Sequence, residues 1–209
     1  MRPILFNTDM VRAILSGSKT VTRRICRDAN KLTVPLSDTI DHNARTYTVE
    51  GINEDGITQY LAERRMPYAA GDILRVRETW AKAAPDIYAY KADNDRQVPR
   101  WHPSIHMPKE AARLFLRVTD VRLERLREIS EEQAQREGIR LQHEDFIPAY
   151  HYRKAELPGD GWETAGSAFA ALWNSTVRPQ ESGRYGWDAN PWVWVIEFER
   201  TDAEEDIEG

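Results

Sequence analysis

Cysteine is nearly absent from this sequence of 209 residues, which contains only Cys26. One thiol cannot form a disulfide within the chain, and it cannot build a zinc site from several cysteines. We therefore interpret Cys26 as a small buried apolar residue rather than a nucleophile. A chain without a disulfide framework suits a reducing compartment, so we predict a cytoplasmic protein.

Long hydrophobic runs are also missing. The opening residues, MRPILFNTDM, hold only a four-residue apolar run, which is not the pattern of a signal peptide. The apolar run WVWVI at 192–196 is far too short to cross a bilayer. We therefore expect a protein with no membrane partner.

Signatures of metal and phosphate binding are absent as well. No glycine-rich loop of the phosphate-binding kind occurs in the sequence. His102 and His106 are four residues apart, but Pro103 opposes the helix that would align them as ligands. We accordingly predict neither a metal site nor a cofactor.

Bases are missing from the end of the chain, and acids are scarce near its start. Residues 202–209, DAEEDIEG, hold five acids and no base, so we predict a disordered acidic tail there. The net charge of −5 comes from this tail, and residues 1–201 are formally neutral. Between Arg12 and Lys31 lie six bases and one acid, Asp28. Such a surface either attracts an anionic partner such as nucleic acid or is simply a solvated charged face.

The hydrophobic periodicity predicts short helices and several strands. A helix over 7–17 has Asn7 or Thr8 as its cap and Gly17 at its end. The next segment alternates, with Thr20, Thr22 and Arg24 on one face and Val21, Arg23 and Ile25 on the other, which indicates a strand. Further helices are predicted at 129–139, where Ser130 and Gln133 form a capping box, and at 166–176. Further strands are predicted at 46–50, 73–77, 113–126 and 190–200.

This order of elements has no βαβ rhythm, so we predict a β-rich α+β fold built on a small barrel. About three short helices are expected at its periphery. Residues 36–66 are polar with little periodicity, and 81–108 are irregular and rich in proline.

Four segments in this order resemble the ASCH domain family, whose barrel is related to the PUA fold: GSKTVTRR at 17–24, GDILRVRETW at 71–80, ISEEQAQREGI at 129–139 and WVWVIEFE at 192–199. The positions that match the family pattern are Gly17, Lys19, Thr20, Thr22, Arg24, Gly71, Asp72, Glu137 and Gly138. The stretches ETW and PSIHMP, at 103–108, are similar to phage and prophage members. The resemblance implies one PUA-like domain over 1–201, with insertions near 36–66, 81–108 and 140–165.

The resemblance also implies a chemistry. A bacterial branch of the family hydrolyses N4-acetylcytidine to cytidine and acetate with a lysine, a threonine three residues later and a glutamate at the end of the later helix. These positions match Lys19, Thr22 and Glu137 in this sequence. Other members are described as RNA-binding or ribonuclease-like. The partner implied is therefore a nucleoside or RNA, and the alternatives are a non-catalytic RNA-binding module or a ribonuclease.

Each candidate residue has a physical role in this hypothesis. Thr22 needs a base to become a nucleophile, and Lys19 can act as that base if burial or the Arg24 charge lowers its pKa. Glu137 would orient the amine or carry the proton. Arg23, Arg24, Glu78 and Trp80 are the predicted substrate-binding residues, with Trp80 either stacking on a base or packing in the core. In the alternative reading, Lys19 is a solvated turn residue, Thr22 an ordinary strand residue and Glu137 a surface acid.

The hypothesis makes a geometric prediction. The segments 17–24, 71–80 and 130–138 are expected to line one cavity. Lys19 and Thr22 are expected at its polar rim, where the fold would tolerate their replacement by alanine.

Overall fold

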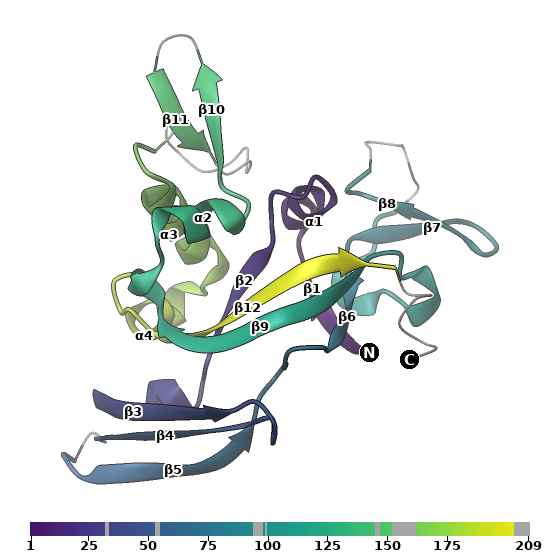
Figure 1. Cartoon of the computed structure of the whole chain (residues 1–209). Coiled ribbons are helices and arrows are strands. Elements are labelled where there is room, and N and C mark those ends of the chain that lie inside the picture. Colours follow the sequence, from purple (N-terminus) through teal and green to yellow (C-terminus); the bar gives the residue numbers. More distant parts are fainter. Residues whose placement is uncertain are drawn as a thin grey trace.

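The computed structural model describes residues 1–31, 34–52, 55–93, 98, 100–144, 147–151 and 162–202. Most of the predicted acidic tail therefore lies outside the described residues. The described chain has a β-rich α+β fold, which confirms the predicted class (Figure 1). At its centre is a five-stranded sheet whose strands run in the order β1 (Arg2–Leu5), β6 (Ile73–Arg77), β9 (Phe115–Arg125), β12 (Trp192–Thr201) and β2 (Val21–Ile25).

This central sheet is open. Strand β1 pairs with β6 in parallel, and the other neighbours are antiparallel. The edge strands β1 and β2 are joined by helix α1 (Thr8–Leu15), and they do not pair with each other in the described part of the chain. The strands described here thus form no closed barrel, and the PUA-like barrel stays a prediction.

The predicted helix and strand at the start of the chain are confirmed. Asn7 caps α1, because its side-chain oxygen accepts a hydrogen bond from the Met10 amide at 2.8 Å. Gly17 follows with a φ of 75°, the left-handed conformation that glycine adopts without strain. The regular strand β2 begins at Val21 and pairs with β12, so that Thr22 lies opposite Ile196 and Arg23 opposite Val195.

Alternation along β2 and β12 places two hydrophobic clusters on opposite faces of the sheet. Ile196 belongs to the cluster that contains Val11 and Ile14 of α1. Val195 belongs to the cluster on the other face, which contains Phe169 of α3 (Ala165–Thr176). Side chains directly opposite each other in an antiparallel pair share a face. Thr22 therefore faces the α1 side of the sheet, and Arg23 faces the α3 side.

Helix α2 (Glu131–Arg136) begins with the predicted capping box, which Ser130 and Gln133 form. The helix also caps its neighbour, because the Glu131 carboxylate accepts hydrogen bonds from the Ala165 and Gly166 amides at the start of α3. A fourth helix, α4 (Ser182–Tyr185), was not predicted. Short 3-10 turns lie at Ala29–Lys31, Ser104–His106, Lys109–Ala111, Leu126–Glu128 and Pro179–Glu181.

The three expected insertions contain more strands than predicted. Residues 36–66 fall largely in an antiparallel sheet of β3 (Val34–Asp41), β4 (Thr46–Ile52) and β5 (Thr58–Arg65), of which only 46–50 was predicted. Two hairpins complete the fold: β7 (Trp80–Ala84) with β8 (Ile87–Tyr90), and β10 (Arg140–Glu144) with β11 (Ile147–His151). Figure 1 shows these three small sheets around the central one. Tyr47 joins the first to the core, with its ring 4.7 Å from that of Trp194.

Gly138 generates a prediction about stability. Its φ is 99°, and a Cβ atom at this position would lie 3.0 Å from the Cβ of Ala13 on α1. Gly138→Ala should therefore lower the free energy of unfolding by about 1–3 kcal/mol, measured by urea denaturation. The matched control is Gly183→Ala in α4, where a Cβ meets nothing within 4 Å and the change should be neutral or stabilising. Equal effects at both glycines would show that Gly138 is not constrained.

Candidate active site

A buried carboxylate joins α2 to the edge strand β2. Glu137, the C-cap residue of α2, has only 3% of its surface exposed. Its Oε2 accepts a hydrogen bond from the Nζ of Lys19 at 2.5 Å, and its Oε1 accepts one from Arg23 at 3.2 Å. Lys19 and Arg23 are themselves 1% and 4% exposed. Two buried cations thus share one buried carboxylate.

Lys19 is held by three acceptors. Besides the Glu137 carboxylate, its Nζ donates to the backbone oxygens of Val21 at 2.8 Å and of Glu137 at 3.0 Å. Three acceptors match the three protons of an ammonium group. Burial lowers the pKa of Lys19, and the Glu137 carboxylate opposes that shift. Our expectation of a lysine at the rim is therefore wrong, because the side chain lies inside the protein.

The turns on either side bring Lys19 to Glu137. After Gly17 the chain folds back on α1, and the Lys19 amide donates to the Ala13 carbonyl at 3.1 Å. Lys19 and Glu137 form an isolated antiparallel bridge, and the Thr20 amide donates to the Arg136 carbonyl. Gly138 permits this contact, since it packs directly against Ala13 and Lys19.

The two terminal nitrogens of Arg23 have hydrogen-bond partners, whereas its Nε has none among the described residues. One of its terminal nitrogens donates to Glu137, and the second donates to Gln133 at 2.8 Å and Glu124 at 3.5 Å. Its guanidinium carbon lies 5.8 Å from the centre of the Phe169 ring. The buried Nε has no hydrogen-bond partner in the described part of the molecule. An unsatisfied buried donor costs about 1–3 kcal/mol. Buried nitrogens of Arg75, Arg77, Trp80 and Trp192 are unpaired in the same way among the described residues.

A small cavity of about 60 Å³ opens beside β2. Its polar wall consists of Thr22, Arg23, Arg24 and Glu137. Thr22 is 3% exposed and so is not at the rim either. The Lys19 amine bonds to the carbonyl of Val21, immediately before Thr22, and not to the Thr22 hydroxyl. The opposite wall is mostly apolar: Met10, Phe169, Leu172, Trp173 and Thr176.

Arg24 has a different environment from Arg23. Its side chain donates to the Leu5 carbonyl at 2.8 Å and lies over the Phe6 ring, with its guanidinium carbon 5.2 Å from the ring centre. It is partly exposed and is one of the cavity-lining residues. It can therefore contact a ligand at the cavity from the α1 side of the sheet.

Glu78 and Trp80 lie in another cluster. The buried Glu78 carboxylate accepts two hydrogen bonds from Arg113, at 2.8 and 3.0 Å. The Trp80 ring stacks on His102 with ring centres 5.0 Å apart. Neither residue lines the cavity beside Thr22, and the segment 71–80 adds nothing to its wall. The structure thus brings together 17–24 and 130–138 but not the third predicted segment.

The predicted basic surface is largely neutralised within the protein. Lys19 and Arg23 are buried against Glu137, and Arg24 donates to a backbone carbonyl. The remaining three bases lie within 4.0 Å of carboxylates: Arg12 near Asp9, Arg27 near Glu181 and Lys31 near Asp28. This arrangement favours a small enclosed site over an open phosphate-binding surface.

The sequence reasoning missed the apolar wall and the partners of Arg23. Phe169, Leu172 and Trp173 belong to the helix predicted at 166–176, and that prediction gave no reason to place them near Thr22. Gln133 was predicted as a cap, and the same side-chain oxygen also accepts from Arg23. A charged residue between the apolar Val21 and Ile25 of one strand face was the available signal, because an inward-facing arginine requires a buried partner.

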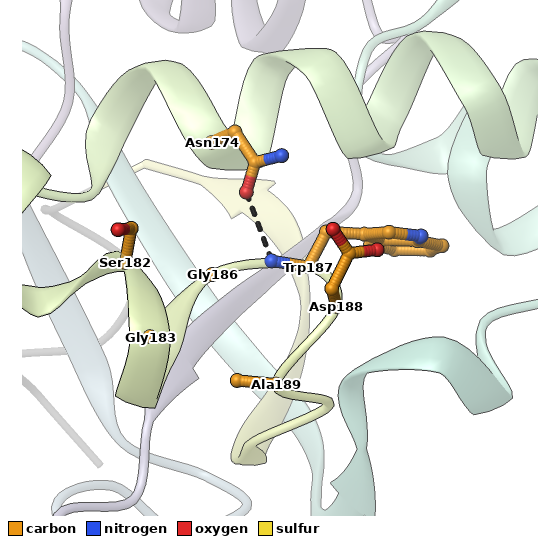
Figure 2. Close-up of a pocket in the computed structure, with 7 residues that line it drawn as sticks. All are labelled: Asn174, Ser182, Gly183, Gly186, Trp187, Asp188 and Ala189. Atoms are coloured by element: carbon orange, nitrogen blue, oxygen red, sulfur yellow. Dashed lines mark hydrogen bonds between the residues drawn. The ribbon is translucent and has the colours of Figure 1, made fainter.

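A wider hollow of about 640 Å³ lies between α3, α4 and the segment that follows α4 (Figure 2). Among the described residues that line it, Asp188 is the charged one. The Asn174 side-chain oxygen accepts a hydrogen bond from the Trp187 amide at 2.8 Å, which braces the segment against α3. None of the predicted site residues lines this hollow.

Comparisons with protein-family models, curated proteins and solved structures found no match. Among the described residues, no helix has both the length and the apolar character needed to cross a membrane. The same residues include no cluster of three or more histidine, cysteine, aspartate or glutamate side chains that could hold a metal ion.

The buried pair generates a prediction for Lys19→Met. Methionine removes the ammonium group and leaves Glu137 with one ion pair, to Arg23, among the described residues, so the free energy of unfolding should fall by about 3–5 kcal/mol in urea denaturation. The control is Lys31→Met, which removes an exposed pair with Asp28 and should cost less than about 1 kcal/mol. Similar small losses for both variants would show that the buried pair does not hold the fold.

Proposed function

We propose that this chain is an ASCH-type, PUA-like protein that binds a nucleoside and hydrolyses the amide of an N4-acylated cytidine. The observation that carries the proposal is the buried contact of Lys19 and Arg23 with Glu137, a residue that lines the same cavity as Thr22. A single buried cysteine fits work in the cytoplasm. The chemistry proposed here uses only protein groups.

The short contact between Lys19 and Glu137 supports a shared proton. Transfer of that proton to Oε2 leaves a neutral amine, which can accept the Thr22 proton as Oγ attacks the acyl carbon. Because Nζ is now bonded to the Val21 carbonyl, it must first turn toward the hydroxyl. The protonated Glu137 then donates to the leaving nitrogen as the C–N bond breaks. Water hydrolyses the Thr22 ester and releases the carboxylic acid, which restores both side chains.

The burial of the cationic side chains favours a small-molecule amide over a polymer as the substrate. Phosphate-reading surfaces present cations to solvent, whereas two of the cations here are buried against a carboxylate. The three cations Lys19, Arg23 and Arg24 outnumber the two carboxylates that they contact, Glu137 and Glu124, so the site retains excess positive charge. That excess suits a carbonyl oxygen that becomes an oxyanion.

The direct test is hydrolysis of N4-acetylcytidine by the purified protein in the presence of a metal chelator, followed by chromatography of released cytidine. Thr22→Ala should lower kcat about a thousandfold or more because it removes the nucleophile. The control is Thr20→Ala, which removes a hydroxyl that bonds to Arg136 and does not line the cavity. Equal turnover by Thr22→Ala and parent would exclude Thr22 as the nucleophile. RNA binding without turnover would favour the binding-module alternative.

The shared proton makes a prediction about pH. Burial lowers the pKa of Lys19 from its ordinary value of 10.5, so the pair should lose this proton below that pH. Since the proton is needed for the leaving nitrogen, kcat should fall as pH rises, with a midpoint below 10.5. Thr22→Ser should keep the midpoint, because it leaves the pair unchanged. A kcat that instead rises throughout the alkaline range would mean that the free amine acts without the shared proton.

A further inference from the structure

One face of the central sheet carries arginines at the end formed by β1, β6 and the start of β9. Leu74 and Val76 of β6 belong to the hydrophobic cluster on the α1 side, so Arg75 and its neighbours in the alternation face the other way. The cluster on that other side, under α3, contains no residue of β1 or β6. Figure 1 shows α2 and α3 toward the opposite end of β9 and β12. We call this surface the arginine face, and its paired strand positions include Leu5, Ile73, Arg75, Arg77, Phe115 and Arg117.

Acidic side chains are scarce on the arginine face. Glu199 of β12 lies opposite Arg117, but its side chain is 63% exposed and its carboxylate is 3.9 Å from the Arg117 Nε. Arg77 donates to a backbone oxygen, the carbonyl of Ile105. The Nε atoms of Arg75 and Arg77 are buried and have no hydrogen-bond partner among the described residues. The face thus retains positive charge that an acidic partner can neutralise.

Apolar side chains lie beside these arginines. Leu5, Ile73 and Phe115 belong to neither hydrophobic cluster of the core. Leu5 is 39% exposed, and Ile105, whose carbonyl Arg77 contacts, is 58% exposed. Arginine and aromatic residues are enriched at the centre of protein–protein interfaces, where lysine is depleted. A surface that binds single-stranded nucleic acid relies on aromatic side chains for base stacking, and Phe115 is the aromatic residue among the positions of the arginine face. The composition therefore favours a protein as the partner.

The edge of β1 is closed to an added strand. Pro3 has no N–H to donate, and its carbonyl already accepts a hydrogen bond from the Tyr68 hydroxyl at 3.3 Å. The Leu5 carbonyl accepts one from Arg24 at 2.8 Å. A partner at this end of the sheet must therefore be recognised through side chains.

We propose that the arginine face docks a partner protein through a segment that carries both carboxylate and aliphatic side chains. The carboxylates of that segment pair with Arg75 and Arg77, and its aliphatic side chains cover Leu5 and Ile105. Charge pairing steers the encounter and sets the orientation, while removal of the apolar side chains from water adds affinity. None of these residues lines the cavity beside Thr22, so the inference goes beyond amide hydrolysis and does not depend on it.

The test uses the full chain and a fluorescent synthetic peptide built from glutamate and leucine, with binding followed by fluorescence anisotropy. The peptide should bind, and its affinity should fall as salt is added, because exposed charges are screened beyond ~10 Å at 0.1 M. Two matched peptides separate the contributions, one with glutamine in place of glutamate and one with serine in place of leucine. Each should bind at least about tenfold more weakly than the first.

Variants of the chain locate the binding surface. Arg75→Gln should weaken peptide binding about tenfold or more, and Leu5→Ser should weaken it as well. The matched control is Arg200→Gln, which changes an exposed arginine on the opposite face of the same sheet, across from Leu116, and should leave the affinity unchanged. Urea denaturation of each variant checks that the fold is retained.

Three outcomes overturn the inference. The first is no binding of the acidic peptide, and the second is binding that neither Arg75→Gln nor Leu5→Ser weakens. The third is tighter binding of oligouridine than of the peptide, lost in Arg75→Gln, which would assign the arginine face to nucleic acid. Hydrolysis is not measured in any of these experiments, so their result is independent of the proposed function.

Discussion

The buried carboxylate of Glu137 is the constraint on which the site depends. Removing a carboxylate from water costs several kcal/mol unless cations and hydrogen bonds replace the solvent. Here Lys19 and Arg23 supply them from one short segment, at the turn after α1 and on the edge strand β2. Each of the three groups is itself buried, so removing the charge of any one of them would leave another buried charge without its partner. The turn, the strand and the end of α2 are therefore fixed together.

The same charge pattern continues across the face of the sheet. Arg23 reaches Glu124, Arg122 links Glu124 to Glu197, and Arg136 joins Glu197 at 2.5 Å. Arg136 also donates to the Thr20 hydroxyl, one residue from Lys19, so the alternating charges return to their starting point. This ring positions α2 over the sheet with polar contacts, whereas α3 is held by apolar packing.

Local signals in the sequence predicted the elements of the site, and longer-range contacts explain what was missed. Asn7, Gly17, Ser130 and Gln133 are caps and turns whose chemistry acts over three or four residues, and their positions are confirmed. The alternation of β2 correctly set Thr22 and Arg23 on opposite faces. The pairing of Glu78 with Arg113 joins residues 35 positions apart and had no local pattern. Of the strands in 34–65 only 46–50 was predicted, and there the alternating Tyr47 and Val49 reach the core.

The polar groups at this site differ in whether they have a hydrogen-bond partner within the protein. Lys19, Glu137 and the terminal nitrogens of Arg23 all have partners, and this saturation fixes their geometry. The Arg23 Nε–H is buried and has no partner among the described residues. An unpaired buried donor destabilises the folded state, because the hydrogen bond that it made to water in the unfolded chain is not replaced. Buried donors of Arg75, Arg77, Trp80 and Trp192 are also unpaired among the described residues, so this cost is spread over the molecule. The saturated groups fix Lys19, Glu137 and the Arg23 guanidinium in one arrangement beside β2.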